Sequence, residues 1–170
     1  MNLSSSAANS EGKEAATHLF IARQPIFSKK LDLFGHELLF RNCSNDACAL
    51  IEDYDDATNK IIADGFAMAL KGLDHGDKIT VNVGYDNILS RYVLALPADR
   101  VVLEVPADMR MDGAFLEACA GLKAQGYSFL VDNYKAQDTP GLSEMLALAE
   151  YVKIPVSSDG GRATARVKRL

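Results

Sequence analysis

The sequence predicts an α/β fold in which helices wrap a mostly parallel sheet. Strand-like apolar runs alternate with helix-like segments along the middle of the chain, and this alternation is typical of such sheets. Of the 170 residues, 48% are hydrophobic, enough for one domain with a substantial core. No apolar stretch approaches the roughly 18 residues that a membrane span needs, so we expect a soluble protein without a membrane partner.

Six segments are predicted to be strands because they are apolar runs, several of them bounded by Gly, Pro or Asp. They are His18–Phe27, Leu33–Phe40, Lys78–Val83, Arg100–Val105, Tyr127–Val131 and Tyr151–Ile154.

Three segments between the strands have apolar residues at helical spacing. The apolar face of the first consists of Ile62, Phe66, Ala69 and Leu73. This helix follows an acidic cap region and is expected to end near Gly72. The second begins near Asp112 and stops at Gly126, a residue type suited to the left-handed position after a helix. The third covers about residues 142–150.

The two ends of the chain differ in composition from the middle. Residues 1–18 are rich in Ser, Ala and Asn, which predicts a flexible tail, and they lack the pattern of a secretion signal, so we expect a cytoplasmic protein. Residues 19–156 form the predicted domain. Residues 157–170 are basic and polar, which favours a disordered tail over a docking or nucleic-acid arm. The net charge of −5 argues against nucleic acid as a general partner.

The three cysteines, Cys43, Cys48 and Cys119, have no CxxC spacing and no histidine at ligand distance in sequence. This pattern argues against a disulfide framework and against a zinc site, so we expect reduced thiols.

Polar residues interrupt five of the predicted strands at or near their C-terminal ends. They are Glu37, Asn82, Glu104, Asp132 and Lys153. In an α/β barrel the active site lies at the C-terminal ends of the strands, so these side chains are expected to converge on one pocket. Carboxylate and amide oxygens suit Mg²⁺, Mn²⁺ or Ca²⁺, and a lysine could face a phosphate.

Single members of this set also have structural interpretations. Asn82 could make a turn, Asp132 could cap the next helix, and Glu104 could be a surface residue at a strand end. The prediction of a site therefore depends on their joint placement.

Six short segments resemble, in order, the motifs of one known family. They are "RQPIF", "HELLFR", "VNVG", "LEVPAD", "GYSFLVDNYKAQD" and "VKIP", spread from about Phe20 to Pro155. The chain is similar to EAL domains, whose active members are metal-dependent phosphodiesterases that hydrolyse cyclic di-GMP on a modified TIM barrel. The amino-acid sequence of the first two segments is especially similar to that of the divergent EAL half of EAL–HDOD proteins. The resemblance implies an incomplete TIM-like (β/α) barrel of EAL type that lacks the last strands.

The resemblance also implies roles for individual residues. The implied metal ligands, for Mg²⁺ or Mn²⁺, are Glu37, Asn82, Glu104 and Asp132. Lys153 is the implied catalytic-site lysine. Arg41 would contact a phosphate of cyclic di-GMP, and Gln24 and Asn133 complete the implied ligand-binding set.

The sequence departs from the family pattern at several points. Asn133 replaces the second aspartate of the family's Asp-Asp pair, so metal affinity should be weakened. The family's glycine-rich loop is "YKAQDTPG" here, and Pro155 replaces the aspartate after the lysine strand. We find no counterpart of the family's general-base glutamate, whose loss would cost about 10²–10⁴ in rate. An incomplete barrel exposes strand edges, so we expect a protein partner or self-association to cover them.

These observations predict a degenerate EAL-domain signalling protein that acts by protein interaction or weak ligand binding and is not an enzyme. Two alternatives remain open. One is an active metal-dependent cyclic di-GMP phosphodiesterase, and the other is a nonfunctional fragment of an EAL–HDOD regulator.

Overall fold

The computed structural model describes residues 18–28, 30–44, 47–50, 66, 70–73, 76–156 and 164–170. The strands are β1 His18–Phe27, β2 Leu33–Ser44, β3 Ala47–Leu50, β4 Lys78–Asn82, β5 Val101–Pro106, β6 Ser128–Asp132, β7 Tyr151–Val156 and β8 Thr164–Arg169. The helices are α3 Tyr85–Leu89, α4 Gly113–Ala124, α5 Leu142–Leu148 and the short 3₁₀ helix η2 Tyr92–Ala95.

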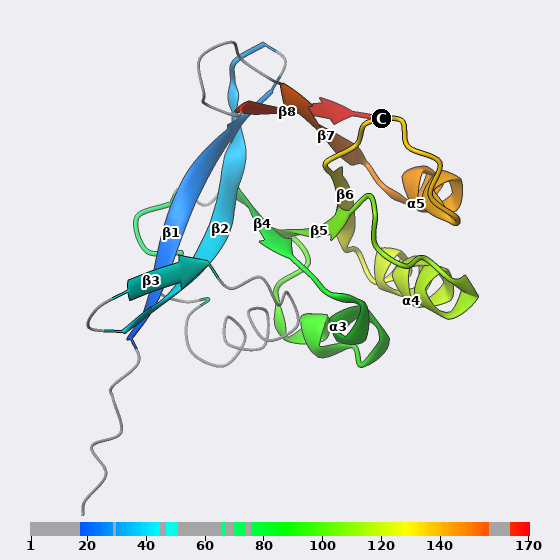
Figure 1. Ribbon diagram of the computed structural model, residues 1–170, viewed down its shortest axis with the longest axis horizontal. Coiled ribbons are helices and arrows are strands. Elements are labelled where there is room, and N and C mark those ends of the chain that lie inside the picture. The colour runs from blue at the N-terminus through cyan, green and yellow to red at the C-terminus, as the bar shows by residue number, and fades with distance from the viewer. Residues whose placement is uncertain are drawn as a thin grey trace, which may run out of the picture.

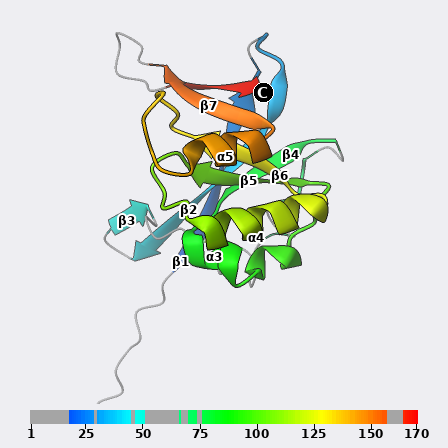
Figure 2. The ribbon, with the colours of Figure 1, turned by 90° about the vertical axis from the view of Figure 1, so that its right-hand side faces the viewer.

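All eight strands belong to one curled sheet in the order β1-β2-β4-β5-β6-β7-β8, with β3 paired to β2. Strands β2, β4, β5, β6 and β7 run parallel, whereas β1, β3 and β8 run antiparallel to their neighbours. The sheet curls from β1 round to β8, and the two edge strands contact each other (Figure 1). Helices α3, α4 and α5 lie along its outer side (Figure 2). The fold is an incomplete TIM-like barrel, as predicted.

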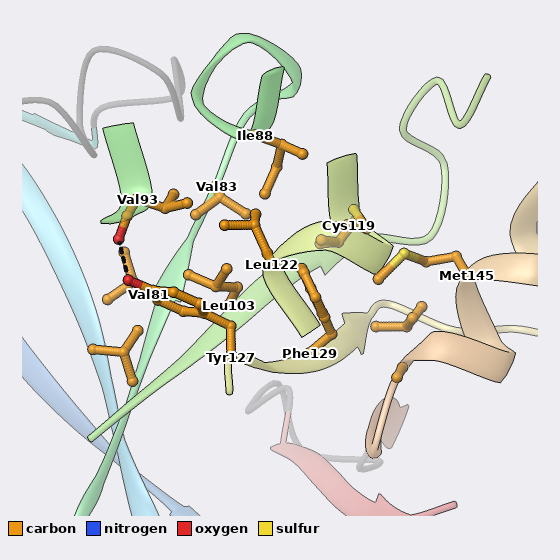
Figure 3. Packing of buried hydrophobic residues seen from close by; sticks show 14 of the residues in the cluster. Val81, Val83, Ile88, Val93, Leu103, Cys119, Leu122, Tyr127, Phe129 and Met145 are labelled. Atoms are coloured by element: carbon orange, nitrogen blue, oxygen red, sulfur yellow. Dashed lines mark hydrogen bonds between the residues drawn. The ribbon is translucent and has the colours of Figure 1, made fainter. Parts of the chain in front are cut away.

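The main core lies between the sheet and the helices. Val81, Leu103 and Phe129 lie on the helix-facing side of their strands, and their strand neighbours point to the inner face, because successive strand residues point to opposite faces. They pack against helix residues that include Leu122 (Figure 3). The hydroxyl of Tyr127, at the edge of this core, donates to the carbonyl oxygens of residues 93 and 96 at 3.0 and 2.6 Å.

A smaller apolar cluster lies on the opposite, inner face of the sheet. Ile26, Val102 and Leu130 are buried there, and Phe34 and Tyr151 pack against them. The rings of Phe34 and Tyr151 meet edge to face, with centroids 4.8 Å apart. Because Val102 and Leu130 lie two residues before Glu104 and Asp132, this cluster forms an apolar floor beneath the polar strand ends.

The six predicted strands are all present. The first has the predicted bounds, and the others differ by one to four residues. The residues after Val156 differ from the prediction of a disordered tail, since Thr164–Arg169 form β8 on the edge of β7. Backbone pairing needs no apolar periodicity, so the polar sequence of β8 gave no sign of this strand. Strand β3, α3 and η2 were also not predicted.

The predicted helix that starts near Asp112 is confirmed. The carboxylate of Asp112 accepts a hydrogen bond from the Phe115 N–H at 3.0 Å and so caps α4, while Gly126 has a positive φ of 95° just after its end. Helix α5 is confirmed with an earlier end. Most of the predicted first helix, and residues 1–17, lie outside the described residues. Phe66 and Leu73, from its predicted apolar face, pack against the core.

Within the part of the chain that the structure describes, no helix is both long enough and apolar enough to cross a membrane.

Candidate functional site

Five polar side chains from five different strands meet on the inner face of the sheet. They are Glu37 on β2, Asn82 on β4, Glu104 on β5, Asp132 on β6 and Lys153 on β7. The register explains the convergence, because the strands are parallel neighbours and Asn82 is the Cα partner of Glu104. The predicted joint placement of these residues is therefore observed.

The ammonium of Lys153 is the centre of this polar group. Its Nζ lies 3.2 Å from Oε2 of Glu37 and 3.2 Å from Oδ1 of Asp132, and it also donates to Oε1 of Glu104. The Nδ2 of Asn82 donates to the other oxygen of Glu37 at 3.2 Å. The three carboxylates are thus linked through a single cation supplied by the chain itself. We call Glu37, Glu104, Asp132 and Lys153 the lysine–carboxylate cluster.

Burial is uneven across the cluster. The Glu104 side chain is 0% exposed, whereas the side chain of Asp132 is 25% exposed. Burial raises the pKa of Glu104 to about 8, because the attraction of Lys153 offsets the cost of desolvating the carboxylate only in part. Its second oxygen, Oε2, is buried and has no hydrogen-bond partner among the described residues. Glu104 can therefore take up or release a proton near neutral pH.

Lys153 responds to the same surroundings in the opposite way. Burial alone would lower the pKa of its ammonium, but the three surrounding carboxylates outweigh burial and hold the pKa above its ordinary value. Lys153 therefore stays charged at neutral pH. Loss of this ammonium would leave the buried carboxyl groups without their charged partner, which is costly in a buried site.

The oxygen donors of the cluster are of the kind that binds Mg²⁺ or Mn²⁺, but their arrangement is suited to an ammonium. Among the described residues, no group of three or more His, Cys, Asp or Glu side chains is placed to hold a metal ion. The carboxylates converge on Nζ of Lys153, so a divalent cation at that point requires Lys153 to move away. The metal-ligand roles of Glu37, Asn82, Glu104 and Asp132 stay predictions.

The other predicted ligand-binding residues lie around this cluster. Gln24 is exposed on β1 and is the antiparallel partner of Glu37, so both lie on the inner face. Asn133 is exposed directly after β6 and has a positive φ of 55°. Arg41 lies on β2 four residues after Glu37, and its side chain lies outside the described part of the chain.

Sequence reasoning missed one buried polar residue near the site. Thr80 is fully buried, lies two residues before Asn82 on the same strand, and is the parallel partner of Glu37. Its hydroxyl oxygen has no hydrogen-bond partner within the described ranges. The sequence contained a signal for Thr80, because side chains alternate between the two faces along "KITVN" and Thr80 therefore shares a face with Asn82.

Comparisons with known proteins bear on the relatives and the fold of this chain. No family model matches the sequence. The chain is 27% identical over 140 residues to the uncharacterized protein YuxH of Bacillus subtilis, a match that covers 80% of this chain and 34% of that protein. It is also 27% identical over 142 residues to the cyclic di-GMP phosphodiesterase CdgJ of Vibrio cholerae, covering 83% of this chain and 32% of CdgJ. The chain therefore spans about a third of the length of these curated relatives.

The fold matches a solved structure of the Bacillus subtilis YkuI protein, which has an EAL domain and was determined in complex with substrate c-di-GMP and calcium. The TM-score is 0.58 at 18% sequence identity, and the match covers 80% of this chain and 40% of YkuI. Together, these comparisons show that the chain has the fold of EAL domains and is similar in sequence to a cyclic di-GMP phosphodiesterase.

Proposed function

We propose that this chain is an EAL-type signalling module that binds cyclic di-GMP weakly and does not hydrolyse it. The observation that supports this proposal is Asn133, an exposed amide directly after Asp132 where the family pattern has a second aspartate, so one negative charge that could hold a divalent cation is missing. The ammonium of Lys153 lies among three predicted metal ligands and is drawn to the same oxygen atoms as a divalent cation, so a metal with one carboxylate fewer competes less well against it.

Weak ligand binding is the activity that the remaining side chains support best. Gln24 is exposed on the same face as the lysine–carboxylate cluster and can donate to or accept from a base or a phosphate. Asn133 is exposed at the end of β6, at the rim of the same face. YkuI, whose solved structure matches this fold, binds c-di-GMP.

The module would act in the cytoplasm, as one domain over residues 19–156 with additional contacts from β8. Protein contacts are the second part of the proposed function. In the described sheet, β1 forms strand pairing with β2 alone although it also contacts β8, so backbone groups on its outer edge that β8 does not cover are offered to a partner strand or to a second copy of the chain.

Two measurements on the purified chain test this function. Incubation with cyclic di-GMP and either Mg²⁺ or Mn²⁺ is expected to produce no linear dinucleotide by chromatography. Calorimetry with cyclic di-GMP is expected to show saturable binding that the Gln24→Ala and Asn133→Ala variants weaken. Lys135→Met, at an exposed lysine just after Asn133, is the matched control and should bind like the unmodified chain. Absence of binding at millimolar ligand would refute the proposal.

The second candidate function is an active phosphodiesterase, and the relationship to CdgJ favours it. Turnover then requires Lys153 to leave the carboxylates when metal binds. Electron paramagnetic resonance of Mn²⁺ separates the two functions, because an active enzyme binds the ion at micromolar concentration. In the inactive module, measurable Mn²⁺ binding should appear only after Lys153→Met combined with Asn133→Asp, which removes the competing cation and adds a carboxylate.

A further inference from the structure

Two buried oxygen atoms on the inner face of the sheet lack hydrogen-bond partners among the described residues. They are Oγ1 of Thr80 on β4 and Oε2 of Glu104 on β5, and both residues are 0% exposed. Buried polar atoms are nearly always hydrogen-bonded, because an unpaired one loses the bonds that it makes with water in the unfolded chain. Two such atoms in one part of the sheet therefore indicate that a small polar molecule binds there.

The strand register makes the two side chains neighbours. Thr80 pairs with Val102 and Asn82 pairs with Glu104 in parallel register, so Thr80 and Glu104 are diagonal neighbours on one face. Adjacent strands lie about 4.8 Å apart and rise about 3.3 Å per residue, so the Cα atoms of this pair are about 8 Å apart. A glutamate side chain can extend over much of this distance, yet the two oxygens do not hydrogen-bond to each other. One water molecule, which makes hydrogen bonds of about 2.8 Å in several directions, can join them.

We propose that one internal water molecule binds between Thr80 and Glu104 and makes Thr80 a positioning residue of the lysine–carboxylate cluster. The water accepts a hydrogen bond from the hydroxyl of Thr80 and donates one to Oε2 of Glu104. Oε1 of the same carboxyl group accepts from Lys153, so both oxygens of Glu104 then have a donor. The water thereby holds the carboxyl group in the orientation that faces the ammonium.

The groups around the two oxygens favour a neutral ligand. The ammonium of Lys153 contacts Glu104 and would repel a further cation, and the three carboxylates of the cluster would repel an anion. Val102 is the strand partner of Thr80 and Leu130 that of Glu104, and neither side chain can donate a hydrogen bond. A water molecule supplies both the donor and the acceptor that are needed. The site belongs to the cluster without any nucleotide, so it does not depend on the proposed function.

Two measurements on the full chain test for the water. A crystal structure at a resolution that shows ordered solvent should place one water about 2.8 Å from both oxygens. In ¹⁵N-labelled protein, the Lys153 ammonium should give a resolved Nζ signal, because a fixed carboxyl acceptor slows the exchange of its protons with solvent.

Three threonine variants separate the hydroxyl from the shape of the side chain. Thr80→Val keeps the shape but lacks the hydroxyl, so it should lose the water and broaden the Lys153 signal beyond detection. Thr80→Ser keeps the hydroxyl and should retain both. Thr139→Val, at a partly exposed threonine, is the control for the substitution itself and should also retain both. Circular dichroism verifies that each variant is folded.

Three results would overturn the proposal. They are a crystal structure of the unmodified chain with no water between the two oxygens, a direct hydrogen bond between Thr80 and Glu104, and a Lys153 signal that Thr80→Val leaves unchanged. The first two need no variant, so they decide the matter even if Thr80→Val fails to fold. If the water is present and the chain binds no cyclic di-GMP in calorimetry, this inference stands and the proposed function fails.

Discussion

Replacement of Lys153 by methionine tests the central role of its ammonium in the lysine–carboxylate cluster. Methionine keeps most of the side-chain length but removes the charge. The loss falls mainly on Glu104, which is 0% exposed and has no other hydrogen-bond partner among the described residues. Glu37 keeps its bond from Asn82, and Asp132 keeps contact with water. Removal of one partner from a buried ionic group costs about 3–5 kcal/mol, so we expect Lys153→Met to lower the free energy of unfolding by that amount at pH 10, where Glu104 is ionised beside Lys153.

The cost should depend on pH in a defined direction. Burial holds the pKa of Glu104 near 8 while Lys153 is present, and loss of the ammonium raises it further. At pH 5 the Glu104 carboxyl is therefore neutral both with and without Lys153, whereas at pH 10 it is ionised beside Lys153 in the unmodified chain. A neutral buried group without a partner costs about 1–3 kcal/mol, so the loss should be smaller at pH 5 than at pH 10.

Urea unfolding followed by circular dichroism at both pH values measures these differences. Lys135→Met, at an exposed lysine, is the control and should change the free energy of unfolding by no more than about 0.5 kcal/mol. In the double variant with Glu104→Gln, part of the loss should be recovered, because the unpaired carboxylate is gone. A loss below about 1 kcal/mol at pH 10, or an equal loss at both pH values, would show that the ammonium does not hold the cluster together.

Three further changes test other parts of the structure. The pKa of Glu104 is raised from its ordinary value of 4.5 to about 8 in the folded chain, so the folded chain binds this proton more tightly than the unfolded chain. The free energy of unfolding should therefore fall as pH rises from about 4.5 to about 8, by at most about 1.4 kcal/mol per pH unit. Glu104→Gln should flatten this slope in pH-dependent urea titrations. Gly141→Ala should lower the free energy of unfolding by more than about 2 kcal/mol in the same assay, because φ is +81° and the added Cβ would lie 2.1 Å from the Met111 carbonyl oxygen. Asp112→Ala should cost about 1–2 kcal/mol through loss of the α4 cap, measured by thermal unfolding.

Each of these changes has its own control. An unchanged slope in Glu104→Gln would assign the pH dependence to other groups. Gly113→Ala is the matched control for Gly141, because an added Cβ there has no atom within 4 Å, and equal losses in both would rule out the steric explanation. Asp112→Asn keeps an acceptor at the cap and should retain most of the stability. If Asp112→Asn lowered the free energy of unfolding as much as Asp112→Ala, the effect would come from the charge of Asp112, including its contact with Arg110.

The convergence of the polar strand ends was predictable, because it follows from local alternation and from the parallel order of the strands. Glu104 and Asp132 each end an apolar run, and sequence order along a parallel sheet makes their strands neighbours. The contacts of Lys153 were not predictable in the same way. They depend on how strongly the sheet curls between β2 and β7, which brings residues 116 positions apart into hydrogen-bond contact. No local pattern encodes that curvature.

Elements held mainly by backbone bonds escaped prediction for a related reason. Strand β8, with Arg166, Lys168 and Arg169, has no apolar pattern, yet it pairs along its whole length with β7. Strand β3 is a run of four residues, too short for a periodicity argument.

The reversed direction of β8 has a kinetic consequence for any polypeptide that would complete the barrel at β7. That strand already has β6 on one side and β8 on the other, so no acceptor position is vacant there. An incoming parallel strand could dock only after β8 dissociates, a step that happens within one molecule. At high concentrations of such a complement, the rate of assembly would therefore reach a plateau set by β8 release.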